Sequence, residues 1–169
     1  LHRQEFDKAI ELLSKALIKN TGYVEARMNL AMAYGESKQF DKAIEQLVSI
    51  KPKRTRVYYL LGSYLYQKGH LFYALRAFAK TAAENPKFFD VEDRLTELRA
   101  YFHKLTSLLE MHQRLASENP NYPDLHYKVG NIAMLLGRKD EAKKSFYEAL
   151  TLKPEYSEAA KKLEALANE

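Results

Sequence analysis

The sequence predicts an all-α solenoid built from antiparallel helix pairs that stack one after another. The pentapeptides Ala-Glu-Asn-Pro-Lys at 83–87 and Ser-Glu-Asn-Pro-Asn at 117–121 lie 34 residues apart, and Leu-Lys-Pro-Glu at 152–155 closes the next interval of 34. Apolar residues follow helical spacing in each interval, and no segment alternates with a period of two. A period of this length is typical of one helix pair per repeat, an architecture that favours binding over catalysis.

Each predicted helix has its own start or stop signal. Asn20-Thr21-Gly22 ends the first helix, and Pro52 stops the third because proline cannot continue a helix. Gly69 and Gly137 supply the left-handed residue of two helix-to-helix turns. The last predicted helix has a polar outer face, which the terminal helix of a solenoid needs because that face meets solvent. The predicted helices are 1–20, 24–36, 40–50, 55–67, 71–84, 123–136, 139–152 and 157–168.

These helices group into one domain, 1–169, of repeated units. The first helix is the second half of a truncated unit, and the helix at 157–168 is a cap. The units are predicted at 24–51, 55–86, 88–120 and 123–154. Since the first helix has no first-half partner, we expect a fragment of a longer protein. Its apolar face would then meet water and could drive self-association, through Phe6, Ile10, Leu13 and Leu17.

The period breaks once. Ala43 and Ala74 are 31 residues apart, so three residues are missing near Ile50–Arg56, and we interpret this as a shortened loop between units. The same segment is the densest basic cluster, with Lys51, Lys53, Arg54 and Arg56. Residues 1–85 carry 14 Lys and Arg against 8 Asp and Glu, whereas residues 86–169 carry 13 against 14. We interpret the cluster as a solvated loop in preference to a nucleic-acid or lipid-headgroup patch.

The period also weakens once, in the unit 88–120. His103 stands where the neighbouring units have Gly69 and Gly137, so the turn loses its most permissive residue. Leu108 and Thr96 replace small residues that let helices approach. Two alternatives remain open, a helix pair with looser packing or one longer helix through Tyr101–Lys104.

The spacing of small and large residues resembles a known family pattern. Leu61-Gly62, Leu65, Ala74, Phe78 and Pro86 in one unit, and Val129-Gly130, Ala133, Ala142, Phe146, Ala149 and Pro154 in another, resemble the tetratricopeptide repeat. The resemblance implies a right-handed α-α superhelical solenoid of about four units, an N-terminal half unit and a capping helix. The segments 121–127 and 136–142 look like bacterial members of the family.

Signals for catalysis are missing from the sequence. It has no cysteine, no metal-ligand histidine spacing, and no glycine-rich phosphate loop or nucleophile elbow. We therefore expect no enzyme activity, no cofactor and no metal. His112 takes the place of Phe78 and Phe146, which predicts a partly buried histidine. Asp90, Asp93 and Glu97 share a helix face that fits solvent or a basic partner better than a cation.

The resemblance also implies a binding surface, because the first helix of each unit lines a concave groove in this family. Methionine and tyrosine in that stripe are typical of adaptable binding surfaces, although part of it could pack between helices. We expect a scaffold or adaptor that binds a peptide or partner-protein segment. The groove candidates are Met28, Asn29, Met32, Arg56, Tyr59, Ser63, Tyr66, Asp90, Asp93, Arg94, Glu97, Tyr127, Asn131 and Met134.

Other functions are less favoured. In family members that grip chaperone C-termini, an arginine would stand where this chain has Leu60, so Asn29 and Arg56 alone do not complete that clamp. Single-stranded RNA binding would suit the basic, tyrosine-rich first half, but no base-reading residues recur at the period. No run of about 18 apolar residues predicts membrane insertion. The compartment stays open, with the cytoplasm favoured over the periplasm.

Overall fold

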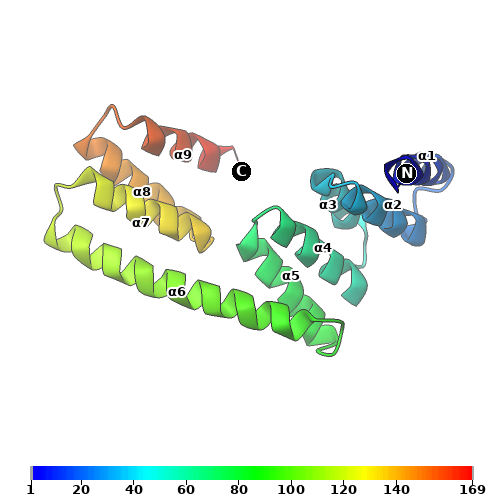
Figure 1. Ribbon diagram of the computed structural model, residues 1–169. Helices are drawn as coiled ribbons and strands as arrows, with labels where there is room; N and C mark the ends of the chain where they lie inside the picture. Colours follow the sequence, from blue (N-terminus) through cyan, green and yellow to red (C-terminus); the bar gives the residue numbers. More distant parts are fainter. Residues whose placement is uncertain (1, 169) are drawn as a thin grey trace. The chain divides into compact units, whose positions relative to one another are not determined.

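The computed structural model describes the backbone of residues 2–168 and the side chains of residues 5–168. Every regular element in this range is a helix, which confirms the all-α prediction (Figure 1). The helices are α1 (His2–Lys19), α2 (Val24–Glu36), α3 (Phe40–Ser49), α4 (Thr55–Gln67), α5 (Leu71–Glu84), α6 (Val91–Glu118), α7 (Pro123–Leu135), α8 (Lys139–Leu152) and α9 (Ser157–Ala167).

The chain divides into two compact units. Unit 1 is Leu1–Glu97 and unit 2 is Leu98–Glu169. In unit 1 each of the helices α1 to α4 packs against the next along the chain, as far as α5. In unit 2 the helices α7 and α8 form an antiparallel pair, and α9 packs on α8. Neighbour-on-neighbour packing of this kind is the solenoid arrangement that the period predicts.

The apolar face of α1 is covered by α2, contrary to expectation. Leu17 is buried in one cluster with Ala26 and Leu30 of α2, and Ile10 and Leu13 pack against that cluster. The face therefore buries its area within the chain, because α2 supplies the missing surface. Leu17 is therefore not exposed as expected, whereas Phe6, Ile10 and Leu13 are partly buried and self-association through this face stays a prediction.

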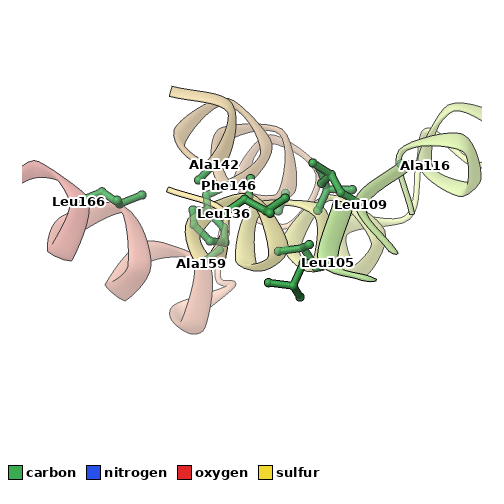
Figure 2. Packing of buried hydrophobic residues seen from close by; sticks show 12 residues of the cluster. Leu105, Leu109, Ala116, Leu136, Ala142, Phe146, Ala159 and Leu166 are labelled. Carbon is green, nitrogen blue, oxygen red and sulfur yellow. The ribbon is translucent and has the colours of Figure 1, made fainter. Parts of the chain in front are cut away.

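The core of unit 2 is one cluster shared by four helices (Figure 2). Leu105 and Leu109 of α6, Val129 and Ile132 of α7, and Phe146 of α8 belong to it, and α9 adds Ala159 and Leu166. Ala142 and Phe146 are fully buried, as expected of residues that let paired helices approach. The helix α9, predicted as a cap, thus covers apolar side chains of this cluster.

The weak unit 88–120 is a single helix and not a pair. The helix α6 runs through His103 without a turn, so the described residues hold three complete helix pairs instead of four. A turn at that position needs a residue with positive φ, which is unfavourable for any residue other than glycine. The helix therefore continues, with its backbone hydrogen bonds intact. Leu108 consequently meets no paired helix and is 38% exposed.

The break in the period shortens a helix and not a loop. The helix α3 has 10 residues, whereas α5 and α8 have 14 each, and the connection from α3 to α4 still has five residues, 50–54. Pro52 accounts for this, because its ring would clash with a carbonyl one turn earlier and it lacks a donor. The prediction of a shortened loop between units is therefore wrong.

Lys53 takes over part of the role of the missing helical turn. Its ammonium Nζ donates hydrogen bonds to the carbonyl oxygens of Val48, at 2.8 Å, and Ile50, at 3.2 Å. Carbonyls at a helix C-terminus have no partner within the helix and attract cations. One lysine of the basic cluster is thus a capping residue.

Three helix-to-helix turns use a left-handed residue. Gly69 has φ of 78° and Gly137 has φ of 72°, which confirms their predicted role. At the corresponding place in the first pair, Lys38 has φ of 59°. A side chain in this conformation brings its Cβ close to the backbone, at a cost of about 1 kcal/mol relative to glycine.

Replacing Lys38 by glycine should therefore stabilise the protein by about 1 kcal/mol, because the strain at positive φ disappears. The free energy of unfolding from urea denaturation measures this change. The reciprocal variant Gly69→Lys should lose a similar amount. A Lys38→Gly variant that unfolds at lower urea than the wild type would contradict the assignment.

Replacing Lys53 by methionine keeps the aliphatic stem but removes both hydrogen bonds to the end of α3. We expect a loss of about 1 kcal/mol in the free energy of unfolding, since two carbonyls lose their charged donor. Lys51→Met is the matched control, because Lys51 makes no hydrogen bond or ion pair with the described part of the chain. Equal stability of the two variants would show that the capping contacts contribute nothing.

Candidate functional site

The predicted groove residues divide between the two units. Met28, Asn29 and Met32 lie on α2, Arg56, Tyr59, Ser63 and Tyr66 on α4, and Asp90, Asp93, Arg94 and Glu97 at the start of α6, all in unit 1. Tyr127, Asn131 and Met134 lie on α7 in unit 2. The ring of Tyr127 packs beside Tyr156, 5.0 Å between centroids, and Phe146, 5.7 Å. In unit 1 the candidates form two groups.

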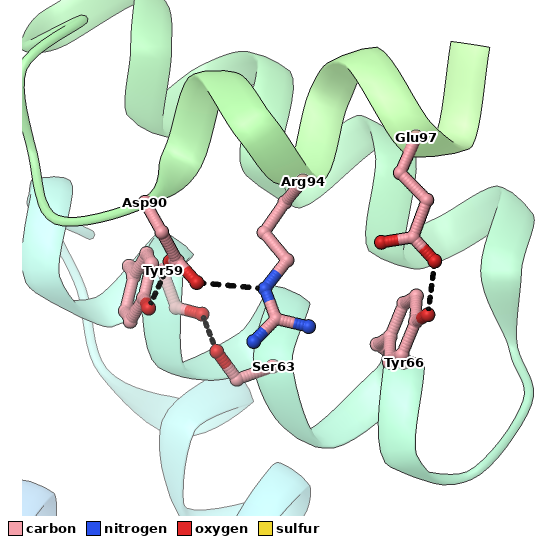
Figure 3. A network of polar contacts seen from close by, with 6 residues as sticks. All are labelled: Tyr59, Ser63, Tyr66, Asp90, Arg94 and Glu97. Carbon is pink, nitrogen blue, oxygen red and sulfur yellow. Dashed lines mark hydrogen bonds and ion pairs between the residues drawn. The ribbon is translucent and has the colours of Figure 1, made fainter. Parts of the chain in front are cut away.

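The first group is a polar network between α4 and the beginning of α6 (Figure 3). The Tyr59 hydroxyl donates a hydrogen bond of 2.6 Å to Asp90 Oδ1, and Arg94 Nε donates one of 2.9 Å to Asp90 Oδ2. The Ser63 hydroxyl donates to the Tyr59 carbonyl at 3.0 Å. The hydrogen bond from Tyr59, with that from Arg94 added, holds the pKa of Asp90 below its usual range. Asp90 is therefore an ionised acceptor that already has two donors.

The same network continues to Tyr66. Its hydroxyl donates a hydrogen bond of 2.7 Å to Glu97 Oε1, and this bond raises the pKa of Tyr66. The Arg94 guanidinium lies 5.5 Å from the centre of the Tyr66 ring, within range of a cation–π contact. Arg94 thus links Asp90 to Tyr66, and both tyrosine hydroxyls are used inside the unit. Asp93 is exposed and has no partner in the described part of the chain.

Phe89 lies beside this network and was missed by the sequence analysis. Its ring is 5.2 Å from that of Tyr59 and 4.7 Å from that of Phe88, between centroids, yet Phe89 is 74% exposed. Its φ of 50° places a bulky residue in the left-handed region. The hydrophobic pattern of the sequence gave no signal for this exposure, because it results from the loop conformation.

The second group consists of Met28 and Met32 on α2 and Arg56 on α4. The Arg56 guanidinium Nη2 lies 3.6 Å from the Met32 sulfur, so the predicted residues from two helices meet here. Met28 and Arg56 border a cleft of about 480 Å³ that lies where α2 and α4 begin. Two loops and the first turns that follow them line the cleft, with residues Asn20, Gly22, Tyr23, Val24, Glu25, Met28, Ile50, Lys51, Pro52, Arg54, Arg56 and Val57.

The cleft carries an uncompensated positive charge. Lys51, Arg54 and Arg56 line it, and none of them forms an ion pair with any residue that the structure describes. Glu25 is the one acidic residue of the lining. Three of the four residues of the basic cluster therefore border this hollow, whereas Lys53 caps α3. The sequence signalled the cluster, but not the cleft beside it.

Unit 2 has a smaller hollow of about 330 Å³ where α6 and α8 flank the beginning of α7. His126 lies in its wall, with Nδ1 at 3.0 Å from Glu148 Oε2 and Nε2 at 2.9 Å from the Pro120 carbonyl oxygen. Both ring nitrogens thus face acceptors within the chain. His126 ties the loop before α7 to α8, which gives it a structural role.

Other kinds of site find no support in the part of the chain that the structure describes. No group of three or more histidine, aspartate or glutamate side chains is arranged to hold a metal ion among residues 5–168. Over the described helices, none combines the length and apolar character needed to cross a bilayer.

Comparison with known proteins agrees with the packing pattern. Models of the tetratricopeptide repeat match residues 1–64 and residues 123–156, which together are more than half of the chain. The chain belongs to the tetratricopeptide repeat family. A curated relative, the TPR repeat-containing protein MJ1428 of Methanocaldococcus jannaschii, is 29% identical over 170 residues, covering 96% of this chain. This chain spans 29% of the length of that relative.

Solved structures of tetratricopeptide proteins share the fold. The crystal structure of MamA matches with a TM-score of 0.55 at 24% identity, covering 92% of each chain. That of YrrB, described as a TPR protein with an unusual peptide-binding site, matches with a TM-score of 0.55 at 18% identity, covering 95% of this chain and 85% of its own. At these identities the likeness establishes the tetratricopeptide solenoid fold.

Replacing Tyr59 by phenylalanine tests the polar network, since it removes only the hydroxyl that donates to Asp90. Near pH 7 we expect a loss of about 1 kcal/mol in the free energy of unfolding. Because the folded-state pKa of Asp90 is lowered, its stabilising contribution is complete above the unfolded-state pKa and is lost as pH falls through the folded-state value.

The difference between Tyr59→Phe and the wild type should accordingly begin to shrink below about pH 4, near the ordinary pKa of an aspartate, and continue to shrink as pH falls toward the lowered pKa of folded Asp90. Urea denaturation near pH 7 and near pH 3 measures it. Tyr147→Phe is the control, because Tyr147 is 63% exposed. A difference that stays constant across this range would mean that Asp90 ionisation does not contribute.

Proposed function

We propose that this protein is a non-enzymatic interaction module that binds a peptide or a segment of a partner protein in unit 1. The binding surface is the cleft at the beginning of α2 and α4 together with the adjoining side of α2 that carries Met28 and Met32, which we call the methionine face. Met28 and Met32 supply apolar contact that adapts to the partner, and Arg56 with Asn29 fixes its polar register. The observation that carries the proposal is the contact of Arg56 with Met32 beside a cleft of about 480 Å³ that Arg56 and Met28 line.

The polar network gives the surface a second part. Tyr59, Ser63 and Tyr66 follow Arg56 on α4 at helical spacing, so they continue the same side of that helix. Hydrogen bonds to Asp90 and Glu97 fix the two tyrosine rings, and fixed rings lose little entropy when a ligand packs on them. The exposed Phe89 ring and the exposed Asp93 carboxylate remain available for contact. We assign the available Asp93 carboxylate to a basic stretch of the partner, and Asp90 and Glu97 add negative charge beside it.

Two kinds of support come from other proteins. Stacked helix pairs create extended surfaces that repeat proteins use for binding. YrrB, which shares the fold, is described as having an unusual peptide-binding site, and we extend peptide binding from it to this chain. Tyr127 and Asn131, on α7, would belong to a corresponding surface of unit 2.

Selection of peptides from a random displayed library on the immobilised protein tests the proposal. Selected peptides should lose about tenfold in affinity when Met32→Glu places a charge in the apolar face. Asn29→Glu should weaken them as well, and this exposed position leaves the core undisturbed. Fluorescence anisotropy of the labelled peptides gives the dissociation constants, and circular dichroism checks that both variants fold.

The control is Leu12→Glu, at a residue of α1 that is 57% exposed and does not line the cleft. It should leave the affinity within about twofold of the wild type. The proposal fails if no peptide is enriched, or if Leu12→Glu weakens the selected peptides as much as the two variants on α2 do.

A further inference from the structure

We propose that the cleft of unit 1 selects acidic partner segments in which carboxylates flank one apolar side chain. This inference rests on the proposed function and adds the chemistry of the partner to it. The positive residues involved, Lys51, Arg54 and Arg56, come from the segment where the period of 34 breaks. The site thus lies where the chain departs from its own repeat.

The early end of α3 explains where the cleft lies. The segment 50–54 replaces the last turn that α5 and α8 both possess, and it passes beside the loop that precedes α2. A regular turn would fill space with helix backbone and side chains. The irregular segment instead leaves a cleft of about 480 Å³, within the range of about 300–1,000 Å³ that ligand sites occupy.

The floor of the cleft is apolar. Ile50 and Val57 are 2% and 3% exposed, so they present fixed aliphatic surface, and Met28 adds an adaptable thioether. Burial of one leucine-sized side chain of a partner against such a floor contributes about 2 kcal/mol. An apolar residue at the centre of the bound segment therefore fits the cleft better than a wholly acidic one.

The rim of the cleft is positively charged and therefore favours a negatively charged partner. Three cations against one carboxylate leave a net charge of +2 on the lining, and none of the three cations is neutralised by a described residue. Opposite charges attract by about 1 kcal/mol in water at 4 Å and by several times more near a protein surface. Carboxylates on both sides of the apolar residue can each reach a cation of the rim.

Nucleic acid fits the same features less well. Single strands bind where successive aromatic side chains stack on the bases, whereas the lining offers one aromatic residue, Tyr23. Glu25 repels phosphates and carboxylates alike, but its oxygens can accept hydrogen bonds from the backbone N–H groups of a peptide, which nucleic acid lacks. The mixture of one carboxylate with an aliphatic floor is thus suited to a polypeptide.

Lys53 holds this arrangement in place. Its two hydrogen bonds to the end of α3 fix the backbone between Lys51 and Arg54. Cations on a fixed segment lose less entropy on binding than cations on a free loop. The cleft is therefore largely preformed.

The test uses three labelled five-residue peptides, acetylated and amidated, and the intact chain. The first has two glutamates, a leucine and two glutamates, the second replaces leucine by glycine, and the third replaces all glutamates by lysine. In fluorescence anisotropy the first should bind the wild type, and the second at least about threefold more weakly. Raising the salt from about 0.05 M to about 0.3 M should weaken the first severalfold.

The double variant Lys51→Glu with Arg54→Glu should lose about tenfold or more in affinity for the acidic peptide and gain affinity for the lysine peptide. The matched control, Lys8→Glu with Lys128→Glu, changes the net charge equally at exposed residues away from the cleft, and should stay within about twofold. Reversal of the preference between peptides does not depend on the stability of the double variant.

The outcomes separate this inference from the proposed function. If library peptides bind the methionine face but the double variant leaves every affinity unchanged, the acidic preference is overturned and the interaction module stands. If no peptide of any kind binds, both fail. A single-stranded oligouridylate that displaces the acidic peptide and binds more tightly also overturns the inference, in favour of nucleic acid.

Discussion

The close contact between a small residue of one helix and a large residue of its partner sets the geometry of every helix pair. A Cβ built on Gly62 would lie 2.8 Å from the Phe78 ring, and one on Gly130 would lie 2.6 Å from the Phe146 ring, both shorter than side-chain atoms tolerate. In the first pair, Ala31 stands at the glycine position and Leu47 at the phenylalanine position, and both are fully buried. Alanine is larger than glycine and leucine is smaller than phenylalanine, so the two changes compensate. The volumes of the two facing residues are thus matched within each pair.

The unit that lacks this contact does not form a pair. Thr96 and His112 stand at the positions of Gly62 and Phe78, but they lie on the same continuous helix, α6. A β-branched residue such as Thr96 at the close contact would force two paired helices apart. The position of the turn also holds His103 in place of glycine, so neither the close contact nor the turn can form. The start of α6 instead places Asp90, just before the helix, and Glu97, in its second turn, opposite Tyr59 and Tyr66. Loss of a helix pair and gain of a polar network have the same origin.

Local signals predicted the helices well. The predicted bounds 24–36, 55–67, 71–84 and 139–152 agree with α2, α4, α5 and α8 to the residue. Proline, glycine and apolar spacing act within a few residues of the helix end, so one sequence suffices to place them. The period itself then identified which residues pack within a pair.

Contacts between distant residues could not be predicted in the same way. The bonds from Tyr59 to Asp90 and from Tyr66 to Glu97 join residues 31 apart, and the resemblance to the family implied only that these residues are candidates for one groove. The period also recorded that three residues were lost, but not whether a loop or a helix had lost them. That choice depended on Pro52 together with Lys53, whose side chain can satisfy the carbonyls that the shorter helix exposes.

The basic cluster shows why composition alone did not decide its role. Four cations lie within six residues, yet their environments differ: Lys53 donates to two backbone carbonyls, Arg56 touches a methionine sulfur, and Lys51 and Arg54 border the cleft without a partner. In a solvated loop all four cations would be similarly exposed to water. Capping of α3 requires only one of them, Lys53. Three cations left unpaired beside an apolar hollow cost stability through mutual repulsion, and among the residues that line the hollow only Glu25 carries an opposite charge. Such repulsion is relieved when an acidic segment binds, so the shortened α3 links the irregularity of the repeat to the selection of a partner.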